Sequence, residues 1–505
     1  MVALQFCLGV ITSWVTGLGG GGFGLVRASN GSYEFIDFRE TAPAAAFEEM
    51  YKDNLDASLY GGLASGVPGE LRGLEYIHKQ YGSLPWFDIL QPAIHIARYG
   101  FTVSKDLAAR MDLIPSPSFL VTDPIWSVDF APNGTRVGAG DFMTRKRYAD
   151  LLEEIANHGP DVFYNGPIAE STVAALRAAN GTMTVQDLAD YKVAIRPVKQ
   201  ISYRGQQVYA CSVPAGGVVV LNVLKAVEGY SDLGWPAQLD LSTHRLTEAI
   251  RFGYGLRTKL GDPAFVEGMD EYQNSMLSDD KAAEVRSKIS DLHTLPVAAY
   301  NPDGLESLET HGTSHAVAAD ASGLAISLTG TLNLLFGSQL MVPETSIIMN
   351  NEMNDFSIPN TINAFGYIAS PANYIRPGKR PLSSMTPVIV ELNNMLYFVV
   401  GGAGGSRIIT AVIQALWNTL DRNMTSLEAV SAPRLHDQLV PNQVDFEYTY
   451  NNRTATFMRE RGHNITWVPL GESSVHAIRR RIDKTFEAAG DPRLADALGR
   501  VVQVH

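Results

Sequence analysis

A threonine at position 313 stands in the segment HGTSH, residues 311–315, immediately before an alternating apolar stretch. A threonine hydroxyl is a weak nucleophile unless a base lies beside it, and the free α-amine of an N-terminal threonine can be that base. An α-amino group has a reference pKa of about 7.7–8.0, so it can accept a proton near neutral pH. Gly312 would allow the backbone conformation that a rearranging peptide bond requires. Taken alone, the segment is more often a turn that leads into a strand.

A glycine-rich segment, GGAGGSRI, occupies residues 401–408 between an apolar stretch and an amphipathic one. Successive glycines can aim backbone N–H groups at one point and so form a hole for an anion or an oxyanion. A nucleotide-binding turn is the competing interpretation, but Arg407 takes the place of the last glycine of G-x-G-x-x-G.

A literal G-x-G-x-x-G occurs at Gly17, Gly19 and Gly22, and Asp37 follows where a ribose-binding acid would be expected. The FGLVRAS that comes next predicts a strand. A bound pyrophosphate needs a helix N-terminus at that place, so we set dinucleotide binding aside.

Three further segments carry polar side chains that could bind a charged small molecule. Arg39 in IDFRETAP has a guanidinium fork that suits a carboxylate. Glu352 and Asp355 in NNEMNDF are three residues apart and could converge on one cation, such as an α-ammonium group. RPLSSM offers the adjacent hydroxyls of Ser383 and Ser384. Each segment alone is better explained as an exposed arginine, a surface acid pair or a helix cap.

The stretches between these segments predict the elements that must position them. Apolar residues at helical spacing predict helices over residues 43–51, 70–81, 107–114, 147–159, 239–259 and 407–420. Residues 314–330 alternate around an Asp-Ala-Ser-Gly turn and residues 385–402 around Asn393-Asn394, so both predict β-hairpins. The N-terminal VALQFCLGVITSWV predicts a buried helix or strand. Helices that enclose stacked sheets fit this order, which indicates a layered α+β class.

The composition excludes several classes of function. The 505 residues are 45% hydrophobic, enough for a large core, and no linker or repeat divides them. A net charge of −13 repels phosphate backbones, so we expect no nucleic-acid partner. The basic run Arg479-Arg480-Arg481 is explained by the solvated face of a C-terminal helix. No uninterrupted run of about 20 apolar residues predicts a transmembrane helix.

The cysteines and the sequons bear on the compartment. Cys7 and Cys211 lie in apolar surroundings, which favours buried free thiols over a metal site or redox pair; a single disulfide between them stays open. Six N-x-S/T sequons together indicate a secretory history, and they begin at Asn30, Asn133, Asn180, Asn423, Asn452 and Asn464. The N-terminus has no basic region and no clear cleavage site, so it is a poor signal peptide.

Taken together and in order, seven segments resemble the γ-glutamyltransferase (glutathione hydrolase) family, and details such as GTSH and FGSQLMVPET resemble its fungal members. The segments are GLGGGGF, DFRETAP, GVPGELRGLEYIHKQYGSLPW, GTSHAVAADASGLAISLTGTLNLLFGS, NNEMNDFS, PGKRPLSSMTPVIV and GGAGGSRI. The resemblance covers nearly the whole chain, and seven ordered motifs of this length exclude chance agreement.

The resemblance implies a four-layer αββα sandwich of the N-terminal-nucleophile (Ntn) hydrolase type, made from one precursor. Cleavage of the Gly312–Thr313 bond would give a large subunit, residues 1–312, and a small catalytic subunit, residues 313–505, which stay together as one structural domain. Thr313 would be the nucleophile and its new α-amine the base. Thr331 would orient Thr313, and the N–H groups of Gly404 and Gly405 would hold the oxyanion.

The resemblance also implies a substrate. Arg39 would bind the donor α-carboxylate with help from Ser383 and Ser384, while Asn333, Glu352 and Asp355 would receive the donor α-ammonium group. A free γ-glutamyl head carries one carboxylate and one ammonium, so these residues supply opposite charges to both. The partners would be glutathione, other γ-glutamyl compounds, and amino-acid or dipeptide acceptors. No metal and no organic cofactor is expected.

One departure from the family pattern and two alternative functions stand beside this expectation. Family members have a signal or membrane anchor, a helix and a strand ahead of the segment that matches LQFCLGVITSWVTG, and this chain starts at that segment. We therefore expect a secretory-pathway protein whose signal or anchor is not in this sequence. One alternative is a cephalosporin-acylase-like amidase of the same fold, which would not need ammonium-binding acids. The other is a non-catalytic or unprocessed relative that binds without cleaving.

Overall fold

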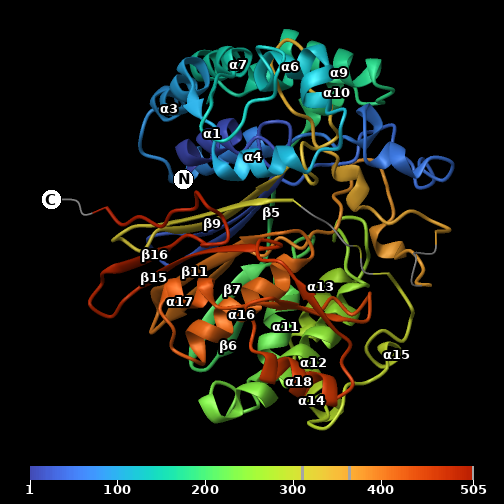
Figure 1. Ribbon diagram of the computed structural model, residues 1–505, viewed down its shortest axis with the longest axis vertical. Coiled ribbons are helices and arrows are strands. Elements are labelled where there is room, and N and C mark those ends of the chain that lie inside the picture. Colours follow the sequence, from blue (N-terminus) through green and yellow to red (C-terminus); the bar gives the residue numbers. More distant parts are fainter. Residues whose placement is uncertain (307, 309–311, 362–365, 503–505) are drawn as a thin grey trace.

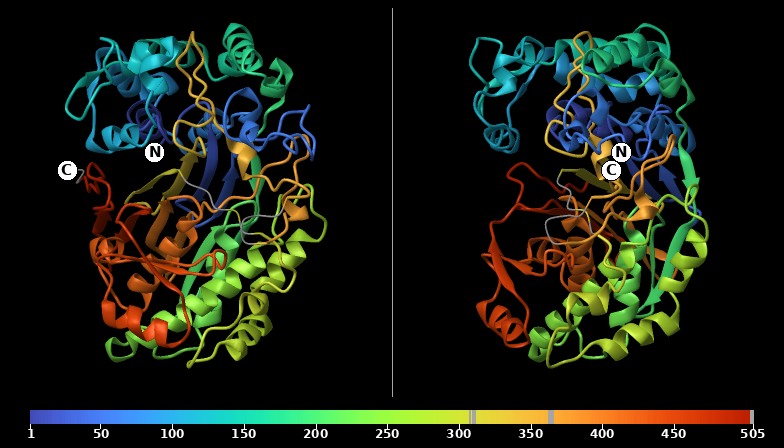
Figure 2. Two further views of the ribbon diagram at one scale, coloured as in Figure 1. Left: turned by 45° about the vertical axis from the view of Figure 1, so that its right-hand side comes forward. Right: turned by 90° about the vertical axis from the view of Figure 1, so that its right-hand side faces the viewer.

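The computed structural model describes residues 1–306, 308, 312–361 and 366–502, and it folds as four layers. Two β-sheets are stacked face to face in the middle, and a layer of helices covers the outer face of each (Figures 1 and 2). This is the αββα sandwich that the resemblance implied, and it confirms the α+β class.

The first sheet has five antiparallel strands in the order β5-β2-β1-β9-β8. Its strands are β1 (Gly21–Arg27), β2 (Tyr33–Asp37), β5 (Ala194–Arg196), β8 (Ser314–Ala319) and β9 (Ala325–Thr331). β8 and β9 form the hairpin predicted at residues 314–330, with the Gly323 N–H donating to the Asp320 carbonyl across the turn, 3.1 Å. FGLVRAS lies on β1, a strand as predicted.

The second sheet has six strands in the order β16-β15-β11-β10-β7-β6. They are β6 (Val198–Tyr203), β7 (Gln206–Cys211), β10 (Val388–Leu392), β11 (Met395–Ala403), β15 (Ser474–Arg480) and β16 (Phe486–Ala489). The β10–β11 hairpin turns at Asn393 and Asn394, whose φ values of 53° and 60° are the positive pair that a two-residue hairpin loop needs. Two small sheets join β3 (Phe101–Thr102) to β4 (Phe142–Met143), and β12 (Leu435–His436) and β14 (Ile465–Val468) to β13 (Val444–Glu447).

The helices divide by position in the chain. Those of the first 190 residues cover the first sheet: α1 (Val2–Ile11), α2 (Glu70–Tyr81), α3 (Trp86–Tyr99), α4 (Lys105–Asp112), α5 (Phe119–Thr122), α6 (Pro124–Phe130), α7 (Lys146–His158), α8 (Asp161–Tyr164), α9 (Pro167–Ala178) and α10 (Val185–Asp190). The rest cover the second sheet: α11 (Gly217–Val227), α12 (Leu239–Arg257), α13 (Met269–Met276), α14 (Asp279–Lys288), α15 (Val297–Tyr300), α16 (Arg407–Leu420), α17 (Ser426–Ser431) and α18 (Asn452–Glu460). None of the helices within these described ranges is long and apolar enough to cross a membrane.

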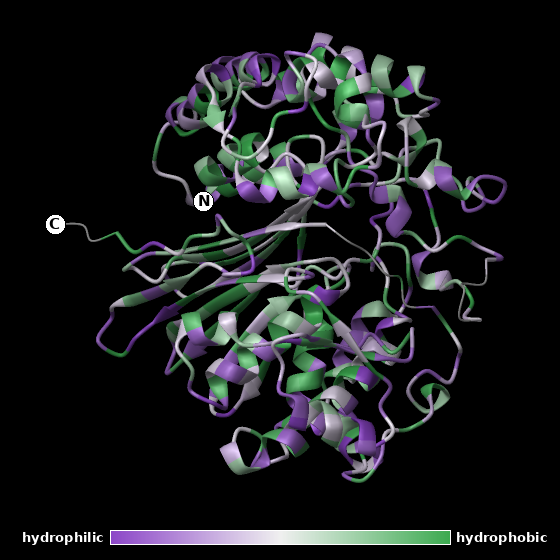
Figure 3. Cartoon of the chain, viewed as in Figure 1, coloured by the Kyte–Doolittle hydropathy of each residue, from purple (hydrophilic) through white to green (hydrophobic). Residues whose placement is uncertain are grey.

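Two hydrophobic cores hold the layers together (Figure 3). One lies between α1, α2, α3, α7 and the outer face of the first sheet, where Ile36 and Leu328 are buried. The other fills the space between the sheets and extends to α11, α12 and α16, with Phe23 from the first sheet and Val399 from the second. Cys7 and Cys211 are free thiols, Cys211 fully buried and Cys7 half-buried, as their apolar surroundings predicted.

The helix predicted over residues 43–51 is wrong. The chain makes successive turns there, such as the hydrogen bond from Ala46 N to Pro43 O at 2.9 Å. The backbone N–H groups that begin this stretch bond to distant parts of the fold: Ala42 N donates to Lys379 O and Ala44 N to Asp187 Oδ1, both 2.8 Å. These tertiary bonds outweigh the local helix propensity of the alanines.

The helical interpretation of Arg479-Arg480-Arg481 is also wrong. Arg479 and Arg480 lie on β15, and Arg481 follows it. Arg479 and Arg481 both form ion pairs with Glu487 on the neighbouring strand β16. Cross-strand charge pairing, not a solvated helix face, therefore explains this basic run.

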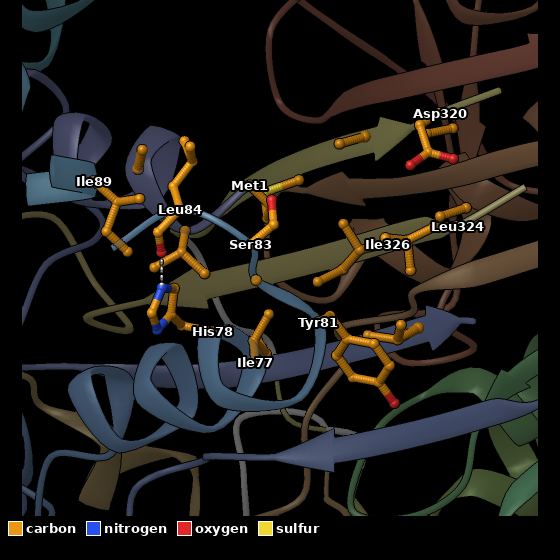
Figure 4. Close-up of a pocket in the computed structure, with 17 residues that line it drawn as sticks. Met1, Ile77, His78, Tyr81, Ser83, Leu84, Ile89, Asp320, Leu324 and Ile326 are labelled. Atoms are coloured by element: carbon orange, nitrogen blue, oxygen red, sulfur yellow. Dashed lines mark hydrogen bonds between the residues drawn. The ribbon is translucent and has the colours of Figure 1, made fainter. Parts of the chain in front are cut away.

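An apolar cavity of about 310 Å³ lies beside the edge strand β8 (Figure 4). Its wall includes Met1, Ile77, Leu84 and Ile326, and His78 Nε2 is 2.8 Å from Leu84 O at one side. None of the predicted site residues lines it.

Candidate active site

Thr313 stands directly before β8, where the first sheet faces β11 and β15 of the second. Its Oγ1 donates a hydrogen bond to the carbonyl oxygen of Gly312, across the bond predicted to break. Gly312 has a φ of 105°, and a Cβ at this position would lie 1.9 Å from the carbonyl oxygen of Asn333. Only glycine fits there, so the sequence places the threonine hydroxyl against the peptide group in front of it. His311 of the HGTSH segment lies outside the described residues.

Thr331 and Asn333 line the same cavity as Thr313 because the β8–β9 hairpin brings them there. Ser314 pairs with Gly330, so the residue before one strand meets the last residue of the other. Thr331 Oγ1 accepts a hydrogen bond from Asn333 N at 2.8 Å, and Asn333 Nδ2 donates to Asn351 O at 3.0 Å. Both side chains are buried. The hairpin thus fixes a second hydroxyl and an amide next to Thr313.

Gly404 and Gly405 connect β11 to α16, with φ values of 125° and 58°. A Cβ on Gly404 would lie 2.6 Å from the Glu472 carbonyl oxygen, which excludes a side chain. Neither glycine N–H donates a hydrogen bond to any residue within the described ranges. The loop therefore has two free backbone donors near Thr313, which is the arrangement that an oxyanion hole requires.

Arg39 is the charged centre of the site and is 1% exposed. It follows β2, and its guanidinium reaches the 3₁₀ turn Glu352–Asp355. Nη2 donates to Asp355 Oδ2 at 2.5 Å, and Nη1 forms an ion pair with Glu352 Oε1. Nε donates to Pro381 O at 3.2 Å. Arg39, the predicted carboxylate-binding group, thus pairs with Glu352 and Asp355, two of the predicted ammonium-binding groups.

Acidic groups outnumber basic groups in this cluster, and burial favours the neutral form of two of them. Glu40, next to Arg39 in the chain, is also fully buried, and burial raises its pKa to about 8 against the opposing effect of Arg39. Burial likewise raises the pKa of Glu352 well above its usual value, although Arg39 opposes the rise and Glu40 adds to it. A ligand cation beside these carboxyls would favour their ionised forms, which suits the predicted ammonium site. The sequence analysis missed Glu40, although DFRETAP contains it.

Ser383 and Ser384 line the other side of the site. Ser383 Oγ accepts from Met385 N at 3.1 Å, and Ser384 Oγ accepts from Arg257 Nη2 at 3.0 Å. Arg257, the last residue of α12, is buried and has no ion pair within the described part of the chain. Burial lowers its pKa. The sequence analysis missed Arg257, because it lies in a stretch whose apolar spacing indicated only a helix.

The predicted residues meet in one small cavity of about 10 Å³, which has room for about one water molecule. Its wall contains Arg39, Gly312, Thr313, Thr331, Asn333, Glu352, Asp355, Ser383, Ser384 and Gly405, together with Met385 and Ile408. Gly404 lines an adjoining cavity that also contains Gly312 and Thr313. Residues from position 39 to position 405 are therefore brought to one point, although the roles predicted for them stay predictions.

A buried group of His244, Glu248 and His463 has the ligand types of a metal site, but it does not line this cavity. His244 Nδ1 is 2.9 Å from His463 Nε2, and Glu248 accepts hydrogen bonds from Tyr300 and Thr294. The contact between the two histidines links α12 to the segment before β14, and this structural role explains the buried group.

Two stacked sheets between helical layers, with a threonine directly before a strand of one sheet, define the Ntn hydrolase class. Within this class, the sequence model of the γ-glutamyltranspeptidase family matches residues 1–500. The chain belongs to the γ-glutamyltranspeptidase family, which confirms the resemblance.

Similar proteins agree with this assignment. The chain is 54% identical to the glutathione hydrolase proenzyme of Arthroderma benhamiae, over 96% of this chain and 84% of that protein. It is 47% identical to the glutathione hydrolase of Aspergillus flavus, over 99% of this chain and 85% of the relative. Among solved structures, cephalosporin acylase from Bacillus halodurans covers 100% of this chain and 91% of its own, with 26% identity and a TM-score of 0.85. γ-Glutamyltranspeptidase from Helicobacter pylori covers 59% and 86%, with 30% identity and a TM-score of 0.55.

Proposed function

We propose that this protein is a glutathione hydrolase and γ-glutamyltransferase that activates itself by breaking the Gly312–Thr313 bond. The observation that carries the proposal is the cavity that joins the Thr313 hydroxyl to the buried charges of Arg39, Glu352 and Asp355. A nucleophile beside groups of both signs suits an acyl donor whose far end is a zwitterion. The fungal glutathione hydrolases at 54% and 47% identity support the same activity.

Maturation begins at the Gly312 carbonyl, to which the Thr313 hydroxyl is hydrogen-bonded. Thr313 Oγ1 adds to the Gly312 carbonyl carbon, the C–N bond breaks, and the acyl group moves from nitrogen to oxygen. Water then hydrolyses the ester, which leaves a carboxylate on Gly312 and a free α-amine on Thr313. Residues 1–312 and 313–505 become two subunits, and the first sheet keeps them together because it takes β1 and β2 from one and β8 and β9 from the other.

In the mature enzyme, the new α-amine takes the proton from Thr313 Oγ1, which attacks the γ-carbonyl carbon of the donor. The N–H groups of Gly404 and Gly405 stabilise the oxyanion. The proton passes to the leaving amine, and a γ-glutamyl ester remains on Thr313. Water resolves the ester in hydrolysis, and the amine of an amino acid or dipeptide resolves it in transfer. Thr331 keeps the nucleophile oriented.

The donor head would be held by charge. Arg39, with Ser383 and Ser384, binds the α-carboxylate, and the buried Arg257 behind Ser384 adds positive potential. Glu352, Asp355 and Asn333 receive the α-ammonium group. The sequons support a further proposal, that this protein passes through the secretory pathway.

Gel electrophoresis with N-terminal sequencing of the purified chain tests the proposal. We expect two bands, the smaller beginning Thr-Ser-His-Ala-Val, and no cleavage in Thr313→Ala. Ser314→Ala, which removes the neighbouring hydroxyl, is the matched control and should be cleaved like the wild type. A single uncleaved band from folded wild-type protein would refute the proposal.

A cephalosporin-acylase-like amidase is the second candidate, and the TM-score of 0.85 to cephalosporin acylase favours it. A glutaryl donor has no α-ammonium group, so it would not need Glu352 and Asp355. We expect γ-glutamyl-p-nitroanilide to be cleaved and glutaryl-p-nitroanilide to be a poor substrate. The opposite preference would identify the chain as an acylase.

A further inference from the structure

A second cavity, of about 370 Å³, also has Thr313 in its wall. Gly312 and Thr313 line both cavities, whereas Arg39, Glu352 and Asp355 line the first and Gly404 lines the second. The nucleophile and the bond in front of it therefore form the boundary between two spaces. A donor that reacts at Thr313 has one half in each of them.

The second cavity has an apolar wall with one cation and one acid. The apolar part comes from Trp14, Val15, Leu113 and Leu335. Arg110, in the last turn of α4, is half-buried, and its side chain has no ion pair or hydrogen bond with a described residue. Glu472, before β15, is exposed, and its carboxylate is also unpaired within the described ranges. Arg110 is thus a guanidinium fork that is free to bind an anion inside the cavity.

The chemistry of the proposed substrate indicates which anion Arg110 would bind. The first cavity is lined by charged groups of both signs, which suit the γ-glutamyl head. The other half of glutathione is an amine, cysteinylglycine, which ends in a carboxylate. We propose that Arg110 binds the free carboxylate of this amine half as it leaves, and the carboxylate of the amino acid or dipeptide that arrives as acceptor in the same cavity. This inference rests on the proposed function.

The same place must serve both molecules, because transfer to an amine is the reverse of acylation. In acylation the Thr313 Oγ1–carbon bond forms and the carbon–nitrogen bond breaks, and the α-amine of Thr313 passes its proton to the departing nitrogen. In transfer the acceptor nitrogen bonds to the carbon, the ester bond to Oγ1 breaks, and the proton returns through the α-amine to Oγ1. Both amines therefore leave from or arrive at one position, next to Gly404.

Arg110→Gln, combined with an acceptor that lacks a carboxylate, tests the inference. The acceptors are glycylglycine and glycylglycinamide, and the donor is γ-glutamyl-p-nitroanilide, whose leaving group has no carboxylate. A hydrogen bond to a charged group contributes about tenfold to hundredfold in binding. We expect the wild type to prefer glycylglycine over its amide by at least tenfold in kcat/KM, and Arg110→Gln to reduce that ratio to about one.

Lys105→Gln is the matched control, because Lys105 is an exposed cation on the same helix that does not line the cavity. It should keep the wild-type preference. Equal preference ratios in the wild type and in Arg110→Gln would overturn the inference while leaving the proposed function intact. Failure of the proposed function looks different, since the wild type would then neither cleave itself nor hydrolyse γ-glutamyl-p-nitroanilide.

Discussion

At the scale of single residues, we expect the conformation of Gly312 to control the proposed self-cleavage. Its φ of 105° leaves no room for alanine, because a Cβ here would lie 1.9 Å from the Asn333 carbonyl oxygen. Gly312→Ala should therefore move the scissile carbonyl away from Thr313 and slow self-cleavage by at least tenfold, measured as the fraction of precursor on a gel over time. Gly304→Ala is the control, since Gly304 also has a positive φ, 64°, but its Cβ would meet open space. Equal cleavage rates in the two variants would contradict the prediction.

A second prediction at this scale concerns Arg257. Its guanidinium is buried and donates to Ser384 Oγ, so it orients that hydroxyl and adds positive potential where the donor carboxylate would bind. Arg257→Gln should raise KM for γ-glutamyl-p-nitroanilide by about tenfold or more, the usual effect of losing a bond to a charged group. Normal self-cleavage in the variant would show that the fold is intact. An unchanged KM would rule out this role.

Most of the predicted site can be found from the sequence because its residues lie in short motifs with distinctive chemistry. The motifs that contain Arg39, Glu352 and Thr313 indicate these residues, and the fold brings all three to one cavity. Glu40 and Arg257 were missed for a physical reason. No pattern in the sequence predicts the burial of either side chain. Only the folded chain shows that they are buried beside other charged groups.

At the scale of elements, periodic segments were predicted well and irregular ones were not. α2 spans Glu70–Tyr81 and α16 spans Arg407–Leu420, the same residues that their apolar spacing indicated. Residues 43–51 have helix-forming alanines, yet the backbone at their start bonds to Lys379 and Asp187. The arginines near position 480 pair with Glu487 across strands. Contacts between residues distant in sequence decided both failures.

The N-terminus of α2 gives a prediction about pH. Glu70, its first residue, is buried and accepts hydrogen bonds from Gln5 at 3.3 Å and Thr16 at 3.1 Å, so it links α2 to α1 and the loop after it. Burial raises its pKa to about 8, whereas in the unfolded chain it titrates near 4.5. Between about pH 4.5 and pH 8, the folded protein therefore keeps the Glu70 proton that the unfolded chain has lost. The stabilisation that comes from this raised pKa is complete below about pH 4.5 and is lost as the pH rises to 8.

Glu70→Gln should remove this loss. Each pKa unit corresponds to about 1.4 kcal/mol. We therefore expect the free energy of unfolding of the variant, relative to that of its parent, to be higher at pH 8.5 than at pH 4.5 by on the order of 4 kcal/mol. Urea unfolding at both pH values, in Thr313→Ala so that the chain stays whole, measures the difference. Glu49→Gln changes an exposed acid and should show no such gain. A parallel pH response in all three proteins would mean that Glu70 titrates normally.

At the scale of the whole molecule, the distance between the sheets sets the geometry of the site, because Thr313 precedes the first sheet's β8 and Gly404 follows the second sheet's β11. Arg27 on β1 crosses this interface. Its Nε pairs with Glu391 on β10 at 2.6 Å, its Nη1 donates to Gly323 O at 2.9 Å, and its Nη2 donates to Asn394 O at 3.2 Å. One buried arginine therefore ties the turns of two hairpins, one from each sheet.

Arg27→Met should lower the free energy of unfolding by about 3–5 kcal/mol, since it leaves the buried Glu391 carboxylate without its partner. Replacing both residues in Arg27→Met/Glu391→Leu should recover a large part of this loss, because neither charge is then left unpaired. Urea unfolding of both variants in Thr313→Ala measures the two values. Disruption of the exposed pair between Lys79 and Glu75 should cost no more than about 0.5 kcal/mol. If the double variant were as unstable as Arg27→Met alone, the hydrogen bonds to the two turns would carry the stabilisation, and the ion pair would not.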